Sequence, residues 1–398
     1  MRVLGIIAEF NPFHNGHKYL IDKAKKMTNS DFCIAIMSGN FTQNGNIAIY
    51  DKFKRADIAT DNGIDMVIEL PTIYATSSSE YFSTGSIDIL NKLNIVDFIC
   101  FGSECGNIQI LKNIANTYIQ NEDYIWNETK KQMKTGNSFA ISKQTCMQEF
   151  LDKSSIKELI KSNNILGIEY IKAIKKLNSS IIPYTIKREG NSYNDESISS
   201  NSNLSSATSI REKILSHNLE DLKNFIPIET QNVIKTQQPL HNENLFYILK
   251  YNILTNKDIL HEFNGVIEGL ENKILESISI SKSYNEFIHN IKSKRYTMSS
   301  IKRMLISILL NVTKNDFEKF KNYDINYAHV LSTSSKGKKL LSEISKNSNI
   351  NLLTSINNKI FSNLNSIDMK SLKLDIFASN IYSSLLNEAI NKDYTNKL

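Results

Sequence analysis

The sequence holds few of the residues that cross-link or interrupt a fold. It has four cysteines, five prolines and one tryptophan among 398 residues. No two cysteines form a C-x-x-C pair, which argues against a zinc ribbon or a disulfide framework. The pattern fits a reducing compartment, so we expect a cytoplasmic protein. Cys33 and Cys100 lie in apolar runs and are predicted to be buried as small hydrophobic side chains.

Long apolar runs are absent as well. No stretch of about 18 apolar residues occurs, so no membrane span is predicted. The opening segment MRVLGIIAEF has no small-residue cleavage site and indicates a first strand, not a signal peptide. With 41% hydrophobic and 22% charged residues, the chain has the composition of a globular protein and the length for two domains.

Charge is spread unevenly along the chain. The formal net charge is +6; residues 1–220 sum to zero and residues 241–398 carry the whole excess. A basic second half suggests that this part meets a polyanion. The segment IKSKRYTMSSIKR at 291–303 has five positive charges and no acid. At helical spacing it is predicted to form a basic ridge for RNA, made of Lys292, Arg295, Lys302 and Arg303.

A second basic cluster is Lys336, Lys338 and Lys339. For both clusters the alternative, solvated lysines on helix faces, stays open.

Strand and helix signals alternate through the first half. Buried strands are predicted at 3–8, 32–37, 65–70 and 96–101, and an edge strand at 181–187, where Pro183 interrupts the run. Helices are predicted after Gly16 and at 51–61, 79–93 and 163–177. This alternation predicts an α/β fold, a Rossmann-like parallel sheet with helices on both faces.

The rest of the chain is predicted to be mostly helical. Residues 107–162 read as a polar helical insertion, and residues 190–206 as a loop rich in Gly, Ser and Asn. Ser209 with Glu212 fits a capping box, so a helix is expected to start there. The predicted domains are residues 1–218, a linker at 219–242 and an all-α C-terminal domain at 243–398.

Two of the seven histidines lie in the segment His14-Asn15-Gly16-His17, directly after the first strand. Parallel sheets bind ligands at the carboxyl ends of their strands, and a helix start offers free N–H groups to an anion. Two imidazoles there can donate to phosphate oxygens, and Gly16 allows close approach. The triphosphate of ATP suits such a site. The alternatives are capping or surface histidines; a metal site is disfavoured, because no third ligand is nearby.

These residues carry a resemblance. The His14–His17 segment resembles the H-x-G-H signature of the HIGH-type nucleotidyltransferase superfamily, and SSATSIR at 205–211 resembles a phosphate-binding stretch of its adenylyltransferases. The segments GIIAEFNPFHNGHKYL, MSGNFTQNG, DKFKRA, VIELP, FGSE, NNILGIEYIKA and TIKREG follow in order. With the helical second half, they resemble the bacterial tRNA(Met) cytidine acetate ligase family over essentially the whole chain.

The resemblance implies an ATP-dependent ligase. Such an enzyme activates acetate as acetyl-adenylate and acetylates N4 of the wobble cytidine of elongator tRNA(Met), without acetyl-CoA. A Mg²⁺ ion on the phosphates is expected, with no legible ligand set in the protein.

The resemblance also implies the site residues. His14 and His17 are the expected catalytic residues. The expected ATP-binding residues are Ile7, Ala8, Glu9, Phe10, Asn11, Pro12, Phe13, His14, Asn15, Gly16, His17, Lys18, Tyr19, Leu20, Gly102, Asn164, Arg188, Ser209 and Arg211, with Ser206 and Thr208 as further phosphate candidates. Glu104 could orient acetate or a metal. Lys52, Lys54 and Arg55 are expected to face the tRNA or the triphosphate.

Two other functions remain open at this point. A small-molecule adenylyltransferase, of the pantetheine-phosphate or nicotinamide-mononucleotide type, resembles residues 1–211 but typically lacks a helical domain of this size. A non-catalytic RNA-binding protein with a vestigial nucleotide site is the other; the intact histidine pair and Arg211 argue against it.

Overall fold

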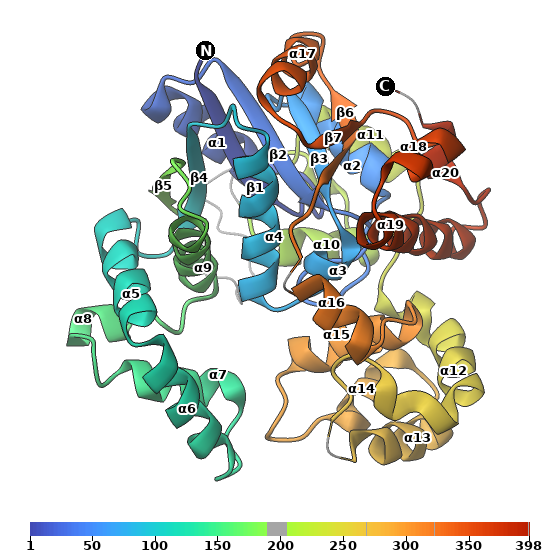
Figure 1. The fold of residues 1–398 in the computed structure, drawn as a ribbon. Helices are drawn as coiled ribbons and strands as arrows, with labels where there is room; N and C mark the ends of the chain where they lie inside the picture. The colour runs from blue at the N-terminus through green and yellow to red at the C-terminus, as the bar shows by residue number, and fades with distance from the viewer. Residues whose placement is uncertain (189–204, 268, 322, 397) are drawn as a thin grey trace.

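The computed structural model describes residues 1–188, 205–267, 269–321, 323–396 and 398. A seven-stranded sheet runs through its centre in the order β5-β4-β1-β2-β3-β6-β7 (Figure 1). The strands are β1 (Val3–Ala8), β2 (Phe32–Ser38), β3 (Met66–Leu70), β4 (Phe98–Ser103), β5 (Ile182–Lys187), β6 (Tyr327–Thr333) and β7 (Asn351–Leu353). All neighbours are parallel except β3 and β6. The predicted Rossmann-like α/β fold is confirmed, and β5 is the edge strand that Pro183 indicated.

Successive residues of the strands face two separate layers of helices. Leu4 of β1 packs in a core with α1 (Asn15–Thr28) and α2 (Lys52–Asp61). Its neighbour Val3 faces the other core, with α4 (Ser79–Lys92) and α9 (Ser162–Lys176). All seven residues of β2 are buried, because a parallel strand covered on both faces is apolar throughout. Cys33 and Cys100 are free and buried, as predicted.

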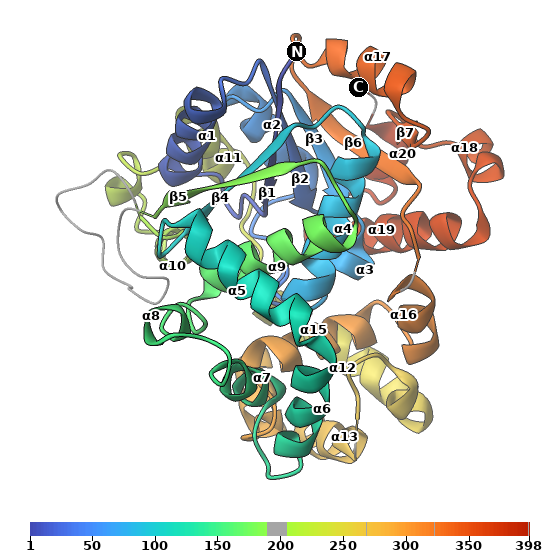
Figure 2. The same cartoon turned by 60° about the vertical axis from the view of Figure 1, so that its left-hand side comes forward.

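Two groups of helices lie at the end of the sheet where the parallel strands finish (Figures 1 and 2). The insertion contributes α5 (Ile108–Gln120), α6 (Glu122–Met133), α7 (Phe139–Met147) and α8 (Lys153–Ile156). The second half contributes η2 (Asn242–Leu245), α12 (Phe246–Thr255), η3 (Lys257–Glu262), α13 (Leu270–Ile280), α14 (Tyr284–Ile291), α15 (Met298–Leu309) and α16 (Lys314–Lys321). In the described part of the chain, no helix combines the length and the apolarity that crossing a membrane needs.

The segment predicted as a linker is folded and packed. It contains η1 (Glu220–Leu222) and α11 (Ile228–Thr236), which starts after Pro227. The Thr230 hydroxyl donates to the Phe13 carbonyl at 2.9 Å, and the Leu240 amide to the Ile49 carbonyl at 3.0 Å. Pro227 directly precedes this helix, where its missing N–H leaves no helical hydrogen bond unmade.

Helix α10 (Ala207–Leu215) begins before the predicted start. Its cap is Ser206, whose hydroxyl accepts from the Ser209 amide at 3.1 Å, so Ser209 stands inside the first turn. The loop predicted at 190–206 lies almost entirely outside the described residues.

The prediction that residues 243–398 are helical throughout is wrong at two segments, β6 and β7. Helix α17 (Lys338–Asn347) lies between these two strands in the chain. After β7 come α18 (Asn358–Asn363), α19 (Ser366–Leu385) and α20 (Lys392–Thr395). In the first half, the short helix α3 (Thr72–Ala75) follows β3. Strand β6 is a short buried run, and the spacing of apolar residues in so short a run does not distinguish a strand from a buried helix. Pairing with β3 makes it a strand.

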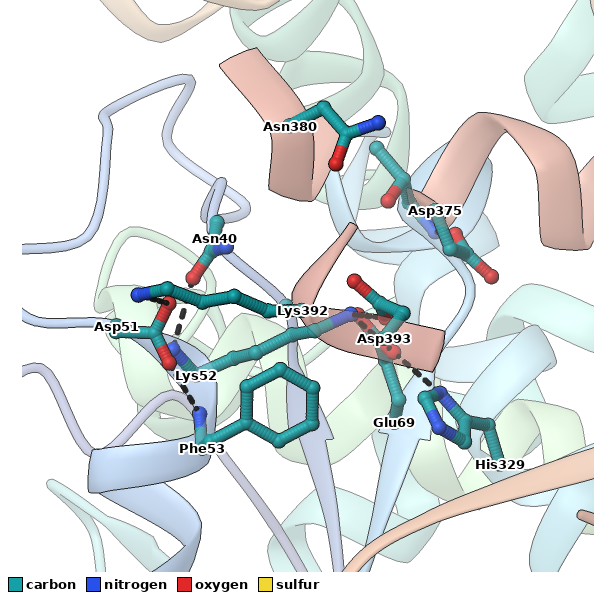
Figure 3. Close-up of polar contacts among 12 residues, drawn as sticks. Asn40, Asp51, Lys52, Phe53, Glu69, His329, Asp375, Asn380, Lys392 and Asp393 are labelled. Atoms are coloured by element: carbon teal, nitrogen blue, oxygen red, sulfur yellow. Dashed lines mark hydrogen bonds and ion pairs between the residues drawn. The ribbon is translucent and has the colours of Figure 1, made fainter. Parts of the chain in front are cut away.

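A buried ionic cluster joins this C-terminal part to the sheet (Figure 3). The Lys52 ammonium, fully buried at the start of α2, lies 2.8 Å from both carboxylate oxygens of Glu69 in β3 and 2.6 Å from Asp393 Oδ1 in α20. His329 of β6 bonds Glu69 Oε2 through Nδ1 at 2.9 Å. Glu69, His329 and Asp393 are close enough to share a cation, and Lys52 supplies one.

The charged groups of this cluster shift one another's pKa values. Burial alone would lower the pKa of Lys52, but the carboxylates of Asp393 and Glu69 outweigh it and raise this pKa. Burial would raise the pKa of Glu69, and Lys52 with His329 lowers it instead. Lys52 and Glu69 are therefore ionised and depend on each other.

We expect Lys52→Met to destabilise the fold by about 3–5 kcal/mol, because it leaves two carboxylates buried without their cation. Lys54→Met is the matched control, since Lys54 is exposed on the same helix and a surface change costs about 0.5 kcal/mol or less. Denaturant unfolding of both variants measures the difference. Equal stabilities of the two variants would contradict the role given to Lys52.

Candidate active site

Strands β1 and β4 separate toward their carboxyl ends, at the point where the order of strands in the sheet reverses. The ladder between β1 and β4 consists of Leu4–Phe98 and Gly5–Ile99, whereas β1 pairs with β2 along its whole length. Strands β2 and β3 lie on one side of β1, and β4 and β5 on the other. Ligands of open α/β sheets bind at such a switch point. A cavity of about 250 Å³ lies there.

The two predicted histidines lie at the N-terminus of α1 and cap it. The Gly16 amide donates to His14 Nδ1 at 3.1 Å, and the His14 amide donates to His17 Nδ1 at 3.3 Å. A Cβ on residue 16 would lie 2.8 Å from the His14 ring, so glycine makes room for this cap. The capping alternative is thus correct, and these hydrogen bonds fix the orientation of both rings. Both line the cavity.

The surroundings of both imidazoles favour the neutral form. Burial lowers the pKa of His14 well below its usual value, and His17, Arg188 and Arg211 add to the shift. Burial and then Arg188 lower the pKa of His17 to about 3. Because each Nδ1 accepts a backbone hydrogen bond, the single proton of each ring resides on Nε2. The two rings, 3.8 Å apart between centroids, therefore present Nε2–H donors.

Two arginines and Lys187 place positive charge on the cavity lining. Arg211 of α10 donates to the Asn11 carbonyl at 2.8 Å and to the Thr208 hydroxyl at 3.0 Å. Arg188 follows β5 and donates to Asn163 Oδ1 at 3.3 Å. Guanidinium groups and neutral N–H donors around one cavity are suited to phosphate.

Glu9 is the carboxylate among the described residues that line this cavity. Its Oε1 accepts from the Gln43 amide at 2.9 Å. Burial raises its pKa, although this hydrogen bond and the charges of Arg211 and Arg55 act in the opposite direction.

Most residues of the predicted nucleotide site line the cavity. They are Ile7, Ala8, Glu9, Phe10, Asn11, His14, Gly16, His17, Tyr19, Leu20, Gly102, Arg188 and Arg211, with Ser206 and Thr208. Others lie behind or beside it: Pro12, Phe13, Asn15, Lys18, Asn164 and Ser209 are not on its lining. Phe13 is fully buried against the sheet, and Lys18 is exposed.

Asn164 and Glu104 hold each other in place beside the cavity lining. The Asn164 side chain accepts from the Glu104 and Cys105 amides at 2.9 and 3.3 Å. Glu104 in turn accepts from the Asn163 and Asn164 amides at the start of α9, where a carboxylate is favoured. Glu104 thus caps α9 in this structure, and its role toward acetate or a metal stays a prediction. Asn164 is fully buried, and its contact with ATP stays a prediction.

Two of the predicted RNA contacts are wrong. Lys52 is buried in the ionic cluster, and Arg55 is fully buried and donates to the carbonyls of Glu9 and Ser38. Their charges look exposed in the sequence because their partners are distant in it. Lys54 is exposed, and its role stays a prediction.

The predicted basic ridge is divided between two settings. Residues 292–297 separate α14 from α15, so the four residues do not share one helix. Lys292 and Arg295 are exposed. Lys302 instead donates to Asn46 Oδ1 at 2.9 Å and Arg303 to the Gln43 carbonyl at 3.2 Å. They hold the loop at residues 42–46, part of which lines the cavity.

Gly45 lets this contact form: its φ is +72°, and a Cβ there would lie 2.4 Å from the Arg303 backbone nitrogen.

The second basic cluster lies at the other end of the sheet. Because β6 runs antiparallel to β3, the residues after Thr333 lie beside the start of β3. Lys336 there bonds the Asp31 carbonyl.

Sequence reasoning missed several cavity residues, among them Asn163, Leu166 and Tyr170. They recur at spacings of three and four along α9, so one helix face was available as a signal. Phe101 and Phe82 complete this apolar side.

The comparison with family models decides the relationship: the model described as HIGH Nucleotidyl Transferase matches residues 1–397. The chain belongs to this family. A curated relative from Clostridium perfringens, named tRNA(Met) cytidine acetate ligase, is 40% identical over 99% of this chain and 98% of its own. One from Thermoanaerobacter sp. with the same name is 41% identical over 96% and 95%.

Solved structures agree. Apo Thermotoga maritima TmcAL superimposes with a TM-score of 0.93 at 30% identity, covering 100% of this chain and 99% of its own. TmcAL bound with alpha-thio ATP gives 0.89 at 31% identity, over 97% and 95%. The family fold therefore includes the helices of the second half.

We expect His14 and His17 to stay neutral, with the proton on Nε2, from pH 8 down to pH 5. Two-bond ¹H–¹⁵N correlation spectra of the folded protein report both the charge and the tautomer. In denaturant the pKa of both rings should be about 6.5, the value of a histidine exposed to water. Below that pH the unfolded state alone takes up protons, so these rings reduce stability as the pH falls. Protonation near pH 6.5 in the folded protein would contradict the assignment.

Proposed function

We propose that this chain is an ATP-dependent tRNA(Met) cytidine acetate ligase. Acetate and ATP give acetyl-adenylate and pyrophosphate, and the acetyl group then passes to N4 of the wobble cytidine of elongator tRNA(Met). The observation that carries the proposal is the pair of histidines that caps the start of α1 and lines a cavity with Arg188 and Arg211. The names of full-length relatives support the choice among reactions of the family.

The first step needs charge neutralisation more than covalent help. An acetate oxygen bonds the α-phosphorus while the bond to pyrophosphate breaks. The Nε2–H groups of His14 and His17 and the guanidinium of Arg211 would donate to phosphate oxygens as their charge grows. These donors are fixed by backbone hydrogen bonds beforehand, so little reorganisation is needed. In the second step N4 bonds the acetyl carbon, AMP leaves and N4 loses one proton.

A Mg²⁺ ion would accompany the nucleotide. Mg²⁺ keeps several waters and needs one or two carboxylates beside the phosphates. Glu9 is the carboxylate that the described lining offers, so the residues present fit an ion held mainly by phosphate and water. The ion would neutralise phosphate charge.

The partners follow from the same proposal. Elongator tRNA(Met) and acetate are the substrates, acetyl-CoA is not used, and the cytoplasm is the expected compartment, consistent with free cysteines. A small-molecule adenylyltransferase is disfavoured, because the curated relatives match over the C-terminal helices as well.

The purified protein should incorporate radiolabelled acetate into elongator tRNA(Met) only when ATP is present. Acetyl-CoA in a parallel reaction should give no label, and nuclease digestion should place the label in cytidine. Release of pyrophosphate with a pantetheine or mononucleotide substrate, and no label in tRNA, would instead support a small-molecule adenylyltransferase.

We expect His14→Ala and His17→Ala to lower acetylation by 100-fold or more, since removing one charge-stabilising donor costs about 10²–10³ in rate. His261→Ala is the control, because His261 is exposed and away from the cavity. Circular dichroism should show folded protein in all three variants. Full activity in either active-site variant would remove that histidine from the mechanism.

A further inference from the structure

A second, larger hollow opens beside the nucleotide cavity. This groove has a volume of about 580 Å³. One wall comes from the insertion and α9, and the other from α15 and the segment before it. Gln43, Asn44, Asn163 and Leu166 line both the groove and the nucleotide cavity. A molecule in the groove can therefore reach a group bound in the cavity.

The groove is positively charged. Four cationic residues and one acid are among its described lining: Lys143, Lys172, Arg295, Arg303 and Glu169. Glu169 is shared, since its two oxygens bond Lys143 at 3.2 Å and Lys172 at 2.7 Å. One carboxylate thus serves two ammonium groups, and the groove keeps an excess of positive charge. That charge attracts a polyanion.

Aromatic and apolar side chains lie among these charges. Phe139 at the start of α7 is 40% exposed and lines the groove. Tyr296 lines the facing wall, beside Arg295. Cations interleaved with aromatic faces and apolar side chains are the composition that single-stranded RNA loops select, because unstacked bases pack on aromatic rings while phosphates meet arginines.

We propose that this groove binds the anticodon loop of the tRNA substrate, with the wobble cytidine unstacked and its N4 placed at the junction of groove and cavity. The inference rests on the proposed function and adds to it the location of the RNA. The junction residues Asn44 and Asn163 are where the base leaves the groove and meets the acetyl group. Arg295, predicted from the sequence as an RNA contact, lies on one wall, and Phe139 was not predicted.

The test separates the two half-reactions in the full-length protein. Acetate-dependent exchange of pyrophosphate into ATP requires no tRNA, whereas acetyl transfer does. Phe139→Ala and Arg295→Ala change one wall each, and neither residue lines the nucleotide cavity. We expect each to raise KM for elongator tRNA(Met) by roughly tenfold, the effect of one lost base stack or phosphate contact, with exchange within twofold of wild type.

Controls match each change. Tyr247→Ala removes an aromatic ring that is 79% exposed on α12, outside the groove lining, and Lys339→Ala removes an exposed cation at the far end of the sheet. Both should keep the wild-type KM for tRNA. Phe139→Trp should restore binding, because a ring is all that stacking requires.

A direct probe is tRNA that carries 5-iodocytidine at the wobble position. After irradiation, cross-linked peptides should map to residues 133–147 or 295–304. Cross-links elsewhere, or wild-type KM in both groove variants, would overturn the groove assignment while leaving the ligase function standing. Loss of exchange in parallel with transfer would place a small substrate in the groove and also overturn it. Absence of both half-reactions in the wild type would end the proposed function, and the groove assignment with it.

Discussion

The ammonium of Lys52 is shared by a carboxylate of the central sheet and one from the last helix. This contact joins residues that are 341 positions apart, and His329 adds β6 to the same carboxylate. The chain between α11 and β6 is therefore held at both ends, since Thr230 ties α11 to the segment after β1. Within this span α15 packs on the loop at 42–46. The segment that packs on this loop of the nucleotide cavity is thus followed in the chain by β6 and α20, which the ion pair joins to β3.

The two histidines of the site contribute neutral N–H donors to anion binding, not positive charge. Burial keeps both rings neutral, and their Nδ1 atoms are occupied by backbone amides. Formal positive charge on the cavity lining comes from Lys187, Arg188 and Arg211. This division suits a substrate whose charge moves during reaction, because fixed neutral donors stabilise the developing charge and need not change protonation state.

The sequence predicts those parts of this structure that local signals determine. The strand at residues 32–37 is a continuous apolar run because it is covered on both faces, and the histidine pair marks the end of the first strand. Strand β6 was missed because pairing with β3, far away in sequence, selects its conformation. Lys52 and Arg55 were misread for the same reason: a charged residue reads as exposed unless its partners are known. The groove could not be predicted, since its two walls come from segments more than 100 residues apart.

The shared border of cavity and groove has a consequence for the stability of the intermediate. An acyl phosphate anhydride is lost by hydrolysis unless the site keeps water out. Four residues, Gln43, Asn44, Asn163 and Leu166, form the common edge of the two hollows. A molecule bound in the groove therefore lies against this edge of the cavity. In the proposed complex the acceptor nucleic acid would itself shield this edge from water. The lifetime of the activated acetyl group would then be coupled to the arrival of its recipient.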